Sequence, residues 1–354
     1  MEDRMANKKR ITEVVDNKWT VGFYRFLHEV TTDDGSSLVM TQKIPIDRQP
    51  VATVMLVHGL GQNRYTWNLS GRSLENFLIA NGFETYNVEL RGHGLSRAIS
   101  GNYPNRFRTY LEYDLPAFIH AIRNTSKTDQ LFYMGHSLGA TISYCIGDRF
   151  QKELSGIISI GGPFHMAKGN FLLKNIARAG VAIEKLMPFS LPYPKAFYID
   201  YIGAVAKTGL FIMDSPLYRI PLQVWYPGSM ERDILEERIT KGFDRTGMNV
   251  VRFMFKWGAK GKLRSMYDDT DYEKRIRKLK QPILFIVGDK DCAVPLEAVQ
   301  AAYDLAGSKD KTIKIFDRQS TPTHWGHIDL ISGRHAPGYV WPYTLKWLQK
   351  RLSA

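Results

Sequence analysis

The ten residues LFYMGHSLGA (131–140) constrain the fold of this chain more than any other stretch. An apolar run of strand type ends in the sharp sequence Gly135-His136-Ser137-Leu138-Gly139 and continues in small and β-branched residues. Glycines two positions before and after Ser137 remove Cβ atoms that would collide where a strand and a helix crowd together. The pattern G-x-S-x-G therefore predicts a strand–turn–helix that lifts the Ser137 hydroxyl above the edge of a sheet.

Short apolar runs and helical patterns alternate along the chain. The runs are nearly continuous, as in strands covered on both faces: 53–57, 84–90, 131–135, 156–162, 282–288 and 312–317. Helical patterns occupy 73–82, which Gly82 should end, 110–124, where Pro116 marks a kink or a late start, 296–307 and 342–352. The alternation predicts an α/β fold, an open and mostly parallel sheet with helices on both faces. The first forty-odd residues, with a turn at 31–37, should form an antiparallel hairpin at one edge.

The alternation stops after Phe164. Residues 165–280 contain no convincing buried strand and are rich in aromatic and basic residues. We expect a core in two parts, 1–164 and 281–354, and a mainly helical cap or lid at 165–280 above the carboxyl ends of the strands. Its apolar side chains should line an acyl pocket or form the core of the cap itself: Phe171, Met187, Phe189, Tyr193, Phe197, Tyr198, Phe211 and Met213.

The chain carries a net charge of +13, of which +9 falls in residues 165–280. A basic surface can attract anionic lipid, nucleic acid or acidic substrates, or can simply keep a protein in solution. The sequence has no zinc-finger spacing, no aromatic RNA-binding strand and no long basic helix, so we expect no nucleic-acid partner.

The first residues of the chain, its apolar runs and its two cysteines indicate the cellular compartment that we expect. The first residues lack the apolar core of a signal peptide, and no apolar run approaches the roughly 18 residues needed to span a bilayer. Cys145 and Cys292 are far apart and lie in no metal-binding spacing, so we expect buried, unpaired thiols. These features predict a cytoplasmic protein, with peripheral contact to an anionic membrane as an option.

A serine hydroxyl needs a base to remove its proton, and that base is usually a histidine oriented by a carboxylate. The loop after strand 282–288 reads GDKDCAVP and offers Asp289 and Asp291. We favour Asp291, which lies further beyond the strand end, and interpret Asp289 as a turn residue. The loop after strand 312–317 offers His324 and His327. We favour His327, which follows a glycine and precedes an apolar run, with His324 as a wall residue.

Acyl transfer also needs two N–H donors for the developing oxyanion. The residue after the serine provides one, the backbone N–H of Leu138, and the glycine-rich loop VHGLGQNRYTW (57–67) provides the other through Leu60.

The chain resembles the α/β-hydrolase superfamily, in its serine esterase and lipase branch. The resemblance rests on VHGLGQNRYTW, LIANGFETYNVELRGHGLS, YMGHSLGA, ILFIVGDKDCAVP and HWGHIDLI. It implies that the loop RGHGLS is structural, that His327 of the H-x-D triplet is the base, and that Asp329 supports it locally. It also implies carboxylic-ester hydrolysis through an acyl-enzyme on Ser137, with no metal and no organic cofactor.

Substrate chemistry stays open at this point. Lipophilic acyl esters fit an apolar cap, whereas a thioesterase, an amidase or a carbon–carbon bond hydrolase would use the same triad. A hydrolase-like ligand receptor or scaffold is the alternative outside catalysis, and an intact Ser/Asp/His set argues against it.

Overall fold

The computed structural model describes residues 9–17, 19–186, 194–215, 223–265, 268 and 270–352. Its centre is a nine-stranded sheet in the order β1-β2-β3-β5-β4-β6-β7-β10-β11. The strands are β1 (Lys9–Asp16), β2 (Trp19–Thr31), β3 (Ser37–Pro45), β4 (Thr53–Val57), β5 (Glu84–Glu89), β6 (Leu131–His136), β7 (Gly156–Ile160), β10 (Ile283–Gly288) and β11 (Lys311–Phe316). From β5 to β11 all neighbouring strands are parallel. The first three strands form an antiparallel meander at one edge. The predicted α/β architecture is confirmed, and β1 extends the predicted hairpin by a strand.

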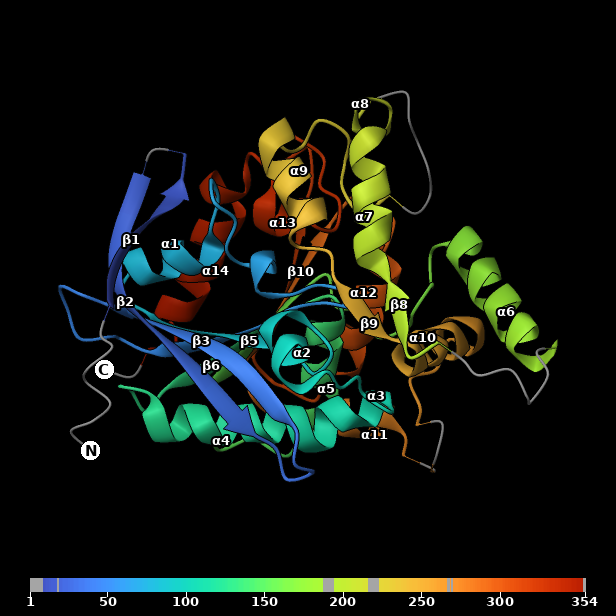
Figure 1. Cartoon of the computed structure of the whole chain (residues 1–354), viewed down its shortest axis with the longest axis horizontal. Helices are drawn as coiled ribbons and strands as arrows, with labels where there is room; N and C mark the ends of the chain where they lie inside the picture. The colour runs from blue at the N-terminus through green and yellow to red at the C-terminus, as the bar shows by residue number, and fades with distance from the viewer. Residues whose placement is uncertain are drawn as a thin grey trace.

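Helices cover both faces of this sheet (Figure 1). Successive side chains of β4 alternate between the two layers, because neighbouring side chains of a strand point to opposite faces. Met55 and Val57 pack in the cluster that includes residues of α4, α5 and α12, and Val54 and Leu56 pack in the one that includes α1 and α14. The helices of these layers and their loops are α1 (Leu74–Ala80), α2 (Gly94–Ser100), α3 (Phe107–Thr109), α4 (Leu115–Thr125), α5 (Leu138–Ile146), α12 (Leu296–Leu305), α13 (Asp329–Ser332) and α14 (Val340–Gln349).

The helix boundaries have local causes. Ser73 caps α1, accepting a hydrogen bond from Asn76 N (2.9 Å). Gly82 follows α1 with φ +88°. Pro116 lies in the first turn of α4, behind a π-helical turn at Tyr110–Asp114 that continues directly from α3, so the proline follows an irregular turn within a helical stretch, and the predicted alternative of a late helix start is wrong.

Between β7 and β10 the chain forms helices and one short ribbon. The helices are α6 (Phe171–Leu186), α7 (Ile199–Thr208), α8 (Leu210–Met213), α9 (Arg232–Thr240), α10 (Met248–Lys260) and α11 (Tyr272–Ile276). Sequence reasoning missed the ribbon, in which β8 (Ala196–Tyr198) pairs antiparallel with β9 (Arg245–Gly247). Three-residue strands are too short to display an alternating pattern. Figure 1 shows α6 at the outer edge of the molecule beside α10, where a Cβ on Gly180 would lie 2.6 Å from the Phe255 ring.

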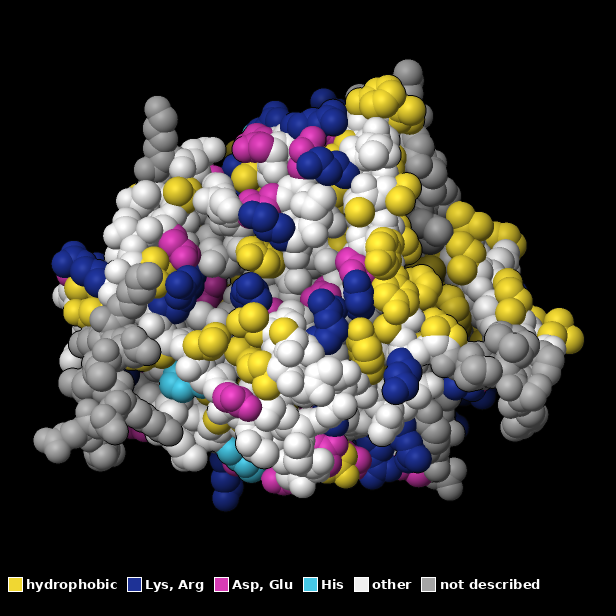
Figure 2. All heavy atoms as spheres, in the orientation of Figure 1, with side chains coloured by type: hydrophobic (Ala, Val, Ile, Leu, Met, Phe, Trp, Pro, Cys, Tyr) yellow, Lys and Arg dark blue, Asp and Glu magenta, His cyan; other side chains and the backbone are white. Residues whose placement is uncertain are grey.

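Several apolar side chains of this region lie on the surface. Phe171, Tyr198 and Phe211 are exposed, so the prediction that they line a pocket or form the core of the cap is wrong. They belong to helices that leave one apolar face without cover. Phe197 and Met213 are half-buried, and Met187, Phe189 and Tyr193 lie outside the described residues. Figure 2 shows the exposed apolar side chains gathered over α6, α7 and α8.

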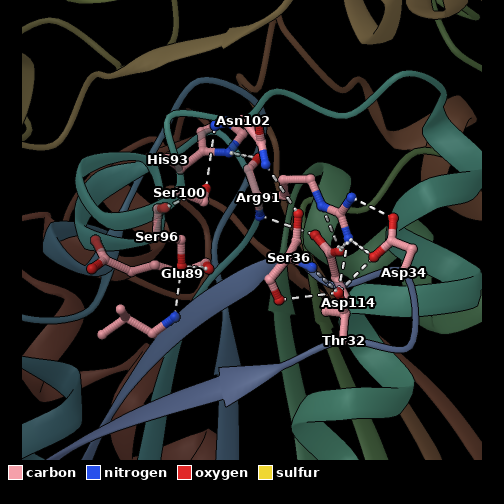
Figure 3. A network of polar contacts seen from close by, with 11 residues as sticks. Thr32, Asp34, Ser36, Glu89, Arg91, His93, Ser96, Ser100, Asn102 and Asp114 are labelled. Atoms are coloured by element: carbon pink, nitrogen blue, oxygen red, sulfur yellow. Dashed lines mark hydrogen bonds and ion pairs between the residues drawn. The ribbon is translucent and has the colours of Figure 1, made fainter.

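A buried ion network ties the loop after β5 to the β2–β3 turn and to the segment before α4 (Figure 3). Arg91 contacts Asp34 in the β2–β3 turn (2.6 Å) and Asp114 before α4 (2.9 Å). Burial raises the pKa of Asp114 to about 6, with Arg91 opposing that shift. Ser96 also contributes, accepting a hydrogen bond from Val39 N (2.8 Å). The network agrees with the structural role expected for RGHGLS.

Cys145 and Cys292 are free thiols. Cys145 is buried as predicted, but Cys292 is half-buried, because it lies in the loop that follows β10. In the part of the chain that the structure describes, no helix combines the length and apolar character needed to cross a membrane.

Candidate active site

Ser137 occupies the sharp turn that the sequence predicts. It joins β6 to α5 with φ +53° and ψ −118°, a conformation that non-glycine residues rarely adopt. A hydrogen bond from Ser137 N to Ile160 O (2.9 Å) ties the turn to β7. A Cβ on Gly135 would lie 2.6 Å from Ala140 N, and one on Gly139 would collide with Val57 O. The turn can form only because both positions are glycine.

The loop after β4 passes directly over the serine. A Cβ on Gly59 would lie 2.9 Å from the Ser137 Cβ. Leu60 follows Gly59, and Leu138 is the first residue of α5, where helix N–H groups have no intrahelical partner. Within the described chain, neither the Leu60 N–H nor the Leu138 N–H donates a hydrogen bond. Both donors predicted for an oxyanion are therefore free of internal hydrogen-bond partners.

His58 supports this loop from below. Its Nε2 accepts a hydrogen bond from Leu90 N (3.1 Å), and its ring lies 4.8 Å from the ring of His93, measured between centroids. Burial, aided by His93, lowers the pKa of His58 to about 3. The imidazole is therefore neutral at physiological pH, as accepting the Leu90 hydrogen bond requires.

Asp291 and His327 form a buried pair. Asp291 Oδ2 lies 2.7 Å from His327 Nδ1, and Asp291 Oδ1 accepts a hydrogen bond from Val294 N (2.7 Å). The carboxylate comes from the loop after β10 and the imidazole from the loop after β11. This geometry fixes the ring and directs Nε2 away from Asp291, as a general base requires.

Gly161 lies closely against this pair, and sequence reasoning missed its role. It follows β7 with φ +56°, and a Cβ there would lie 2.8 Å from His327 Cε1 and 2.9 Å from its Nδ1. The ring of His136, the neighbour of Ser137, lies 4.5 Å from the His327 ring between centroids. The sequence signal that could have revealed this role is the Gly161-Gly162 pair, which directly follows strand β7. Among the described contacts, no hydrogen bond joins Ser137 Oγ to His327. The contact of His327 with the turn of Ser137 runs through the ring of His136.

Asp289 and His324, the two candidates that the sequence analysis did not favour, also pair with each other. Asp289 Oδ2 lies 2.5 Å from His324 Nδ1, and Asp289 Oδ1 accepts a hydrogen bond from Trp325 N (3.0 Å). This pair is more exposed than Asp291–His327, and the His324 ring contacts Tyr226. The same two loops therefore carry two carboxylate–imidazole pairs, and the one nearer His136 and Gly161 is Asp291–His327.

Segments of the insertion pack against the site from above. Val224 O accepts hydrogen bonds from His327 N (3.1 Å) and Ile328 N (2.9 Å). Asp244 N donates to Gly61 O (2.7 Å) on the loop above the serine. Asp329 Oδ2 accepts hydrogen bonds from Gly326 N (2.8 Å) and Tyr226 N (3.3 Å), which gives it the local supporting position expected of it. Burial raises the pKa of Asp329 to about 7.

The side chains of Ser137, Asp291 and His327 are of the types that carry out acid–base and nucleophilic chemistry. In the described part of the chain, no three His, Cys, Asp or Glu side chains are arranged to hold a metal ion.

The contact between Gly161 and His327 yields a stability prediction. Gly161→Ala should lower the free energy of unfolding by about 1–3 kcal/mol more than Gly101→Ala, because the added methyl overpacks the buried pair. Gly101 is the matched control, with φ +64° and no heavy atom within 4 Å of the place that a Cβ would take, so both variants carry similar backbone strain. Urea unfolding monitored by fluorescence measures both losses. Equal losses would contradict a close Gly161–His327 contact.

Comparison with known proteins agrees with this geometry. The family described as serine aminopeptidase, S33, matches residues 48–195. The lysosomal acid lipase/cholesteryl ester hydrolase of Macaca fascicularis is 32% identical over 93% of this chain and 88% of its own length. The human protein of the same name matches equally well.

Solved structures agree in fold. The Paleococcus ferrophilus monoacylglycerol lipase superposes with a TM-score of 0.56 at 17% identity, covering 93% of this chain and 99% of that one. DcsB, solved in complex with a substrate analogue, gives a TM-score of 0.60 at 14% identity over 92% and 99% of the two chains. At such identities the likeness concerns the fold alone. With the sequence match to the acid lipases, the chain belongs to the α/β-hydrolase superfamily, in its branch of carboxylic-ester hydrolases that comprises serine esterases and lipases.

Proposed function

We propose that this protein hydrolyses lipophilic carboxylic esters through a Ser137–Asp291–His327 triad and a covalent acyl-enzyme. The observation that carries the proposal is the buried Asp291–His327 pair, held at Gly161 beside the strained turn of Ser137. A serine alone on a sharp turn would have no base, and an aspartate–histidine pair alone would have no nucleophile.

In the proposed mechanism Ser137 Oγ attacks the ester carbonyl carbon while His327 Nε2 takes its proton. Asp291 holds the proton on Nδ1 and stabilises the imidazolium. The N–H groups of Leu60 and Leu138 stabilise the oxyanion, each worth about 10²–10³ in rate for such donors. His327 then protonates the leaving alcohol oxygen as the carbon–oxygen bond breaks. Water, activated by the same imidazole, attacks the acyl-enzyme, releases the acid and restores Ser137.

Two comparisons bear on the bond that is cleaved. The acid lipases, 32% identical over most of the chain, carry cholesteryl ester hydrolase in their name and favour a lipid-like ester. The family model matching residues 48–195 is described as an aminopeptidase, which makes an amide the second candidate. Thioesters and carbon–carbon bonds remain open chemically, since the triad is the same. An ester, a thioester and an amide of one acyl group would separate these activities.

Two histidine variants test the assignment of the base. His327→Ala should lower kcat/KM for 4-nitrophenyl butyrate by about 10³-fold or more, close to the loss in Ser137→Ala, because residues of a triad act as a unit. His324→Ala removes the other paired imidazole and should keep kcat/KM within about tenfold of wild type. Steady-state kinetics at neutral pH measures both. A larger loss in His324→Ala than in His327→Ala would show that the base belongs to the other pair.

We further propose that residues 165–280 form a cap over a core of 1–164 and 281–354, and that its outer face contacts anionic membranes. Exposed apolar side chains follow one another from the end of β8 through α7 and α8: Tyr198, Tyr201, Ile202, Val205, Phe211 and Ile212. On α6 they are Phe171, Leu172, Ile183 and Leu186. These ten residues form the apolar patch, which Figure 2 shows over all three helices. Monomeric proteins rarely expose so continuous an apolar surface without a partner.

Charge favours an anionic surface. Glu184 on α6 is paired with Arg252 (2.5 Å) and Lys256 (2.9 Å), and Asp200 on α7 is paired with Arg245 (2.8 Å). Cations on the same helices, such as Arg178 and Lys185, add to the net charge of +9 in residues 165–280. A basic rim around an apolar patch suits anionic headgroups above acyl chains. The cytoplasmic location expected from the sequence remains a prediction.

Vesicle flotation tests this contact. The double variant Val205→Asp/Phe211→Asp should bind phosphatidylcholine–phosphatidylserine vesicles at least about tenfold more weakly than wild type, because two apolar side chains no longer enter the lipid. Ile99→Asp, an exposed apolar position on α2, is the matched control and should bind as wild type does. Binding that is equally strong in all three proteins, or absent in wild type at low salt, would refute the membrane contact.

A further inference from the structure

Four cationic side chains are buried in the described chain, and one of them has no partner. Lys43 contacts Glu13 (3.0 Å) and Glu75 (3.3 Å). Arg72 contacts Asp16 and Glu231, and Arg91 contacts Asp34 and Asp114. Arg238 on α9 is completely buried, and its Nε, Nη1 and Nη2 all lack a hydrogen-bond partner. The fold therefore gives each of the other three cations two carboxylates and leaves Arg238 with none.

The charge of Arg238 has no counter-ion in the neighbouring cap either. Burial lowers the pKa of Arg238 to about 9, so the guanidinium remains protonated at neutral pH. Among the described residues no carboxylate pairs with it, and the undescribed segments 187–193 and 216–222 contain no Asp or Glu, so that Asp269 is the one acidic residue of the cap outside the described residues. A buried unpaired charge costs several kcal/mol. Such a group persists where an anion from outside the chain completes it.

The guanidinium lies beside the loop that covers the serine. A Cβ on Gly242 would lie 2.5 Å from Arg238 Nη1, which places that nitrogen against the residue before Phe243. Phe243 forms an isolated antiparallel bridge with Gln62, and Asn63 Nδ2 donates to Lys241 O (2.9 Å). The turn from Arg238 to Asp244 therefore packs directly on the loop that carries Leu60.

Electrostatics agree with this position. Burial and the neighbouring His327 are the larger causes that lower the pKa of His136, the residue before Ser137. The positive charge of Arg238 lowers that pKa further. It contributes in the same direction to the low pKa of His58. Gln62 Oε1, on the loop that Phe243 bridges, already faces Gly59 N (3.2 Å), Thr66 Oγ1 (3.0 Å) and His136 Nδ1 (3.0 Å). This acceptor is occupied, and the three guanidinium nitrogens of Arg238 have no hydrogen-bond partner among the described residues.

We propose that Arg238 binds an anionic group of the substrate, so that the preferred ester carries a carboxylate or a phosphate near the scissile bond. This inference rests on the proposed function and names its substrate class. The planar guanidinium presents five N–H donors in a fork that matches the two oxygens of either anion. Because Arg238 is completely buried, water would screen its ion pair with an entering anion only weakly.

Matched pairs of esters test the proposal. The first pair is 4-nitrophenyl butyrate and 4-nitrophenyl hemisuccinate, in which a carboxylate replaces the terminal methyl group. The second pair is a monoacylglycerol and the 1-acylglycerol 3-phosphate with the same acyl chain, so the two pairs separate carboxylate from phosphate. Wild type should hydrolyse the anionic member of at least one pair with a kcat/KM about tenfold or more above that of the neutral member.

Arg238→Met should remove this preference and keep kcat/KM for the neutral esters within about threefold. Arg232→Met is the matched control on the same helix, because Arg232 is exposed and paired with Glu236, and it should keep the preference. Arg238→Met should also raise the Tm or leave it unchanged, since a methionine removes an unpaired buried charge. A purely structural arginine would give a lower Tm and an equal loss on neutral and anionic esters.

The outcomes are distinct. A wild-type enzyme that hydrolyses neutral esters as well as both anionic ones, or Arg238→Met activity that falls equally on all four, overturns the inference and leaves the proposed function standing. A wild-type protein that hydrolyses none of the four, with Ser137→Ala behaving identically, overturns the proposed function itself.

Discussion

The candidate site depends on one strained residue held between two close-packed elements. Ser137 adopts φ +53° because β6 must turn at once into α5, and the approach of α5 to the end of β4 leaves room only for hydrogen atoms at positions 135 and 139. Strain of this kind costs of order 1–3 kcal/mol and persists only where the surroundings determine it. Here they do so through Ile160 O on one side and the loop of Gly59 on the other. The same crowding places the loop of Gly59 against Ser137, so the proposed nucleophile and the loop that carries one proposed oxyanion donor share a single packing constraint.

The sequence was informative where a residue type answers a local demand. Glycines around Ser137, continuous apolar strands and the end of α1 before Gly82 each reflect contacts within a few residues, and the sheet and its flanking helices followed from them. The choice between Asp289 and Asp291, or between His324 and His327, could not be derived in this way. Both pairs form in the structure, and only packing against Gly161 and His136, residues far away in sequence, distinguishes the one beside the serine. The role of Gly161 and the unpartnered charge of Arg238 depend on such long-range contacts and escaped sequence reasoning.

The insertion behaves differently from the core. Most apolar positions of the predicted core strands are buried, although Ile313 and Ile315 of the edge strand β11 are half-buried. The aromatic residues Phe171, Tyr198 and Phe211, predicted to line a pocket or form the core of the cap, are exposed. Periodicity alone identifies an apolar helix face but says nothing of what covers it. The inward side of the insertion is mostly apolar as well, since Leu210, Trp225 and Ile239 cluster with Ile328. Polar contacts are added to this packing where Val224 O and Asp244 N bind the loops of His327 and Gly61.

The measurement that tests the central claim most directly is the site of covalent modification by a fluorophosphonate. Such a probe bonds to a serine oxygen that a neighbouring base has activated, and peptide mass spectrometry locates the adduct. We predict one adduct per chain, on the peptide containing Ser137, formed with parallel loss of ester hydrolysis. An adduct on another serine, or full loss of hydrolysis with Ser137 unmodified, would contradict the proposed triad.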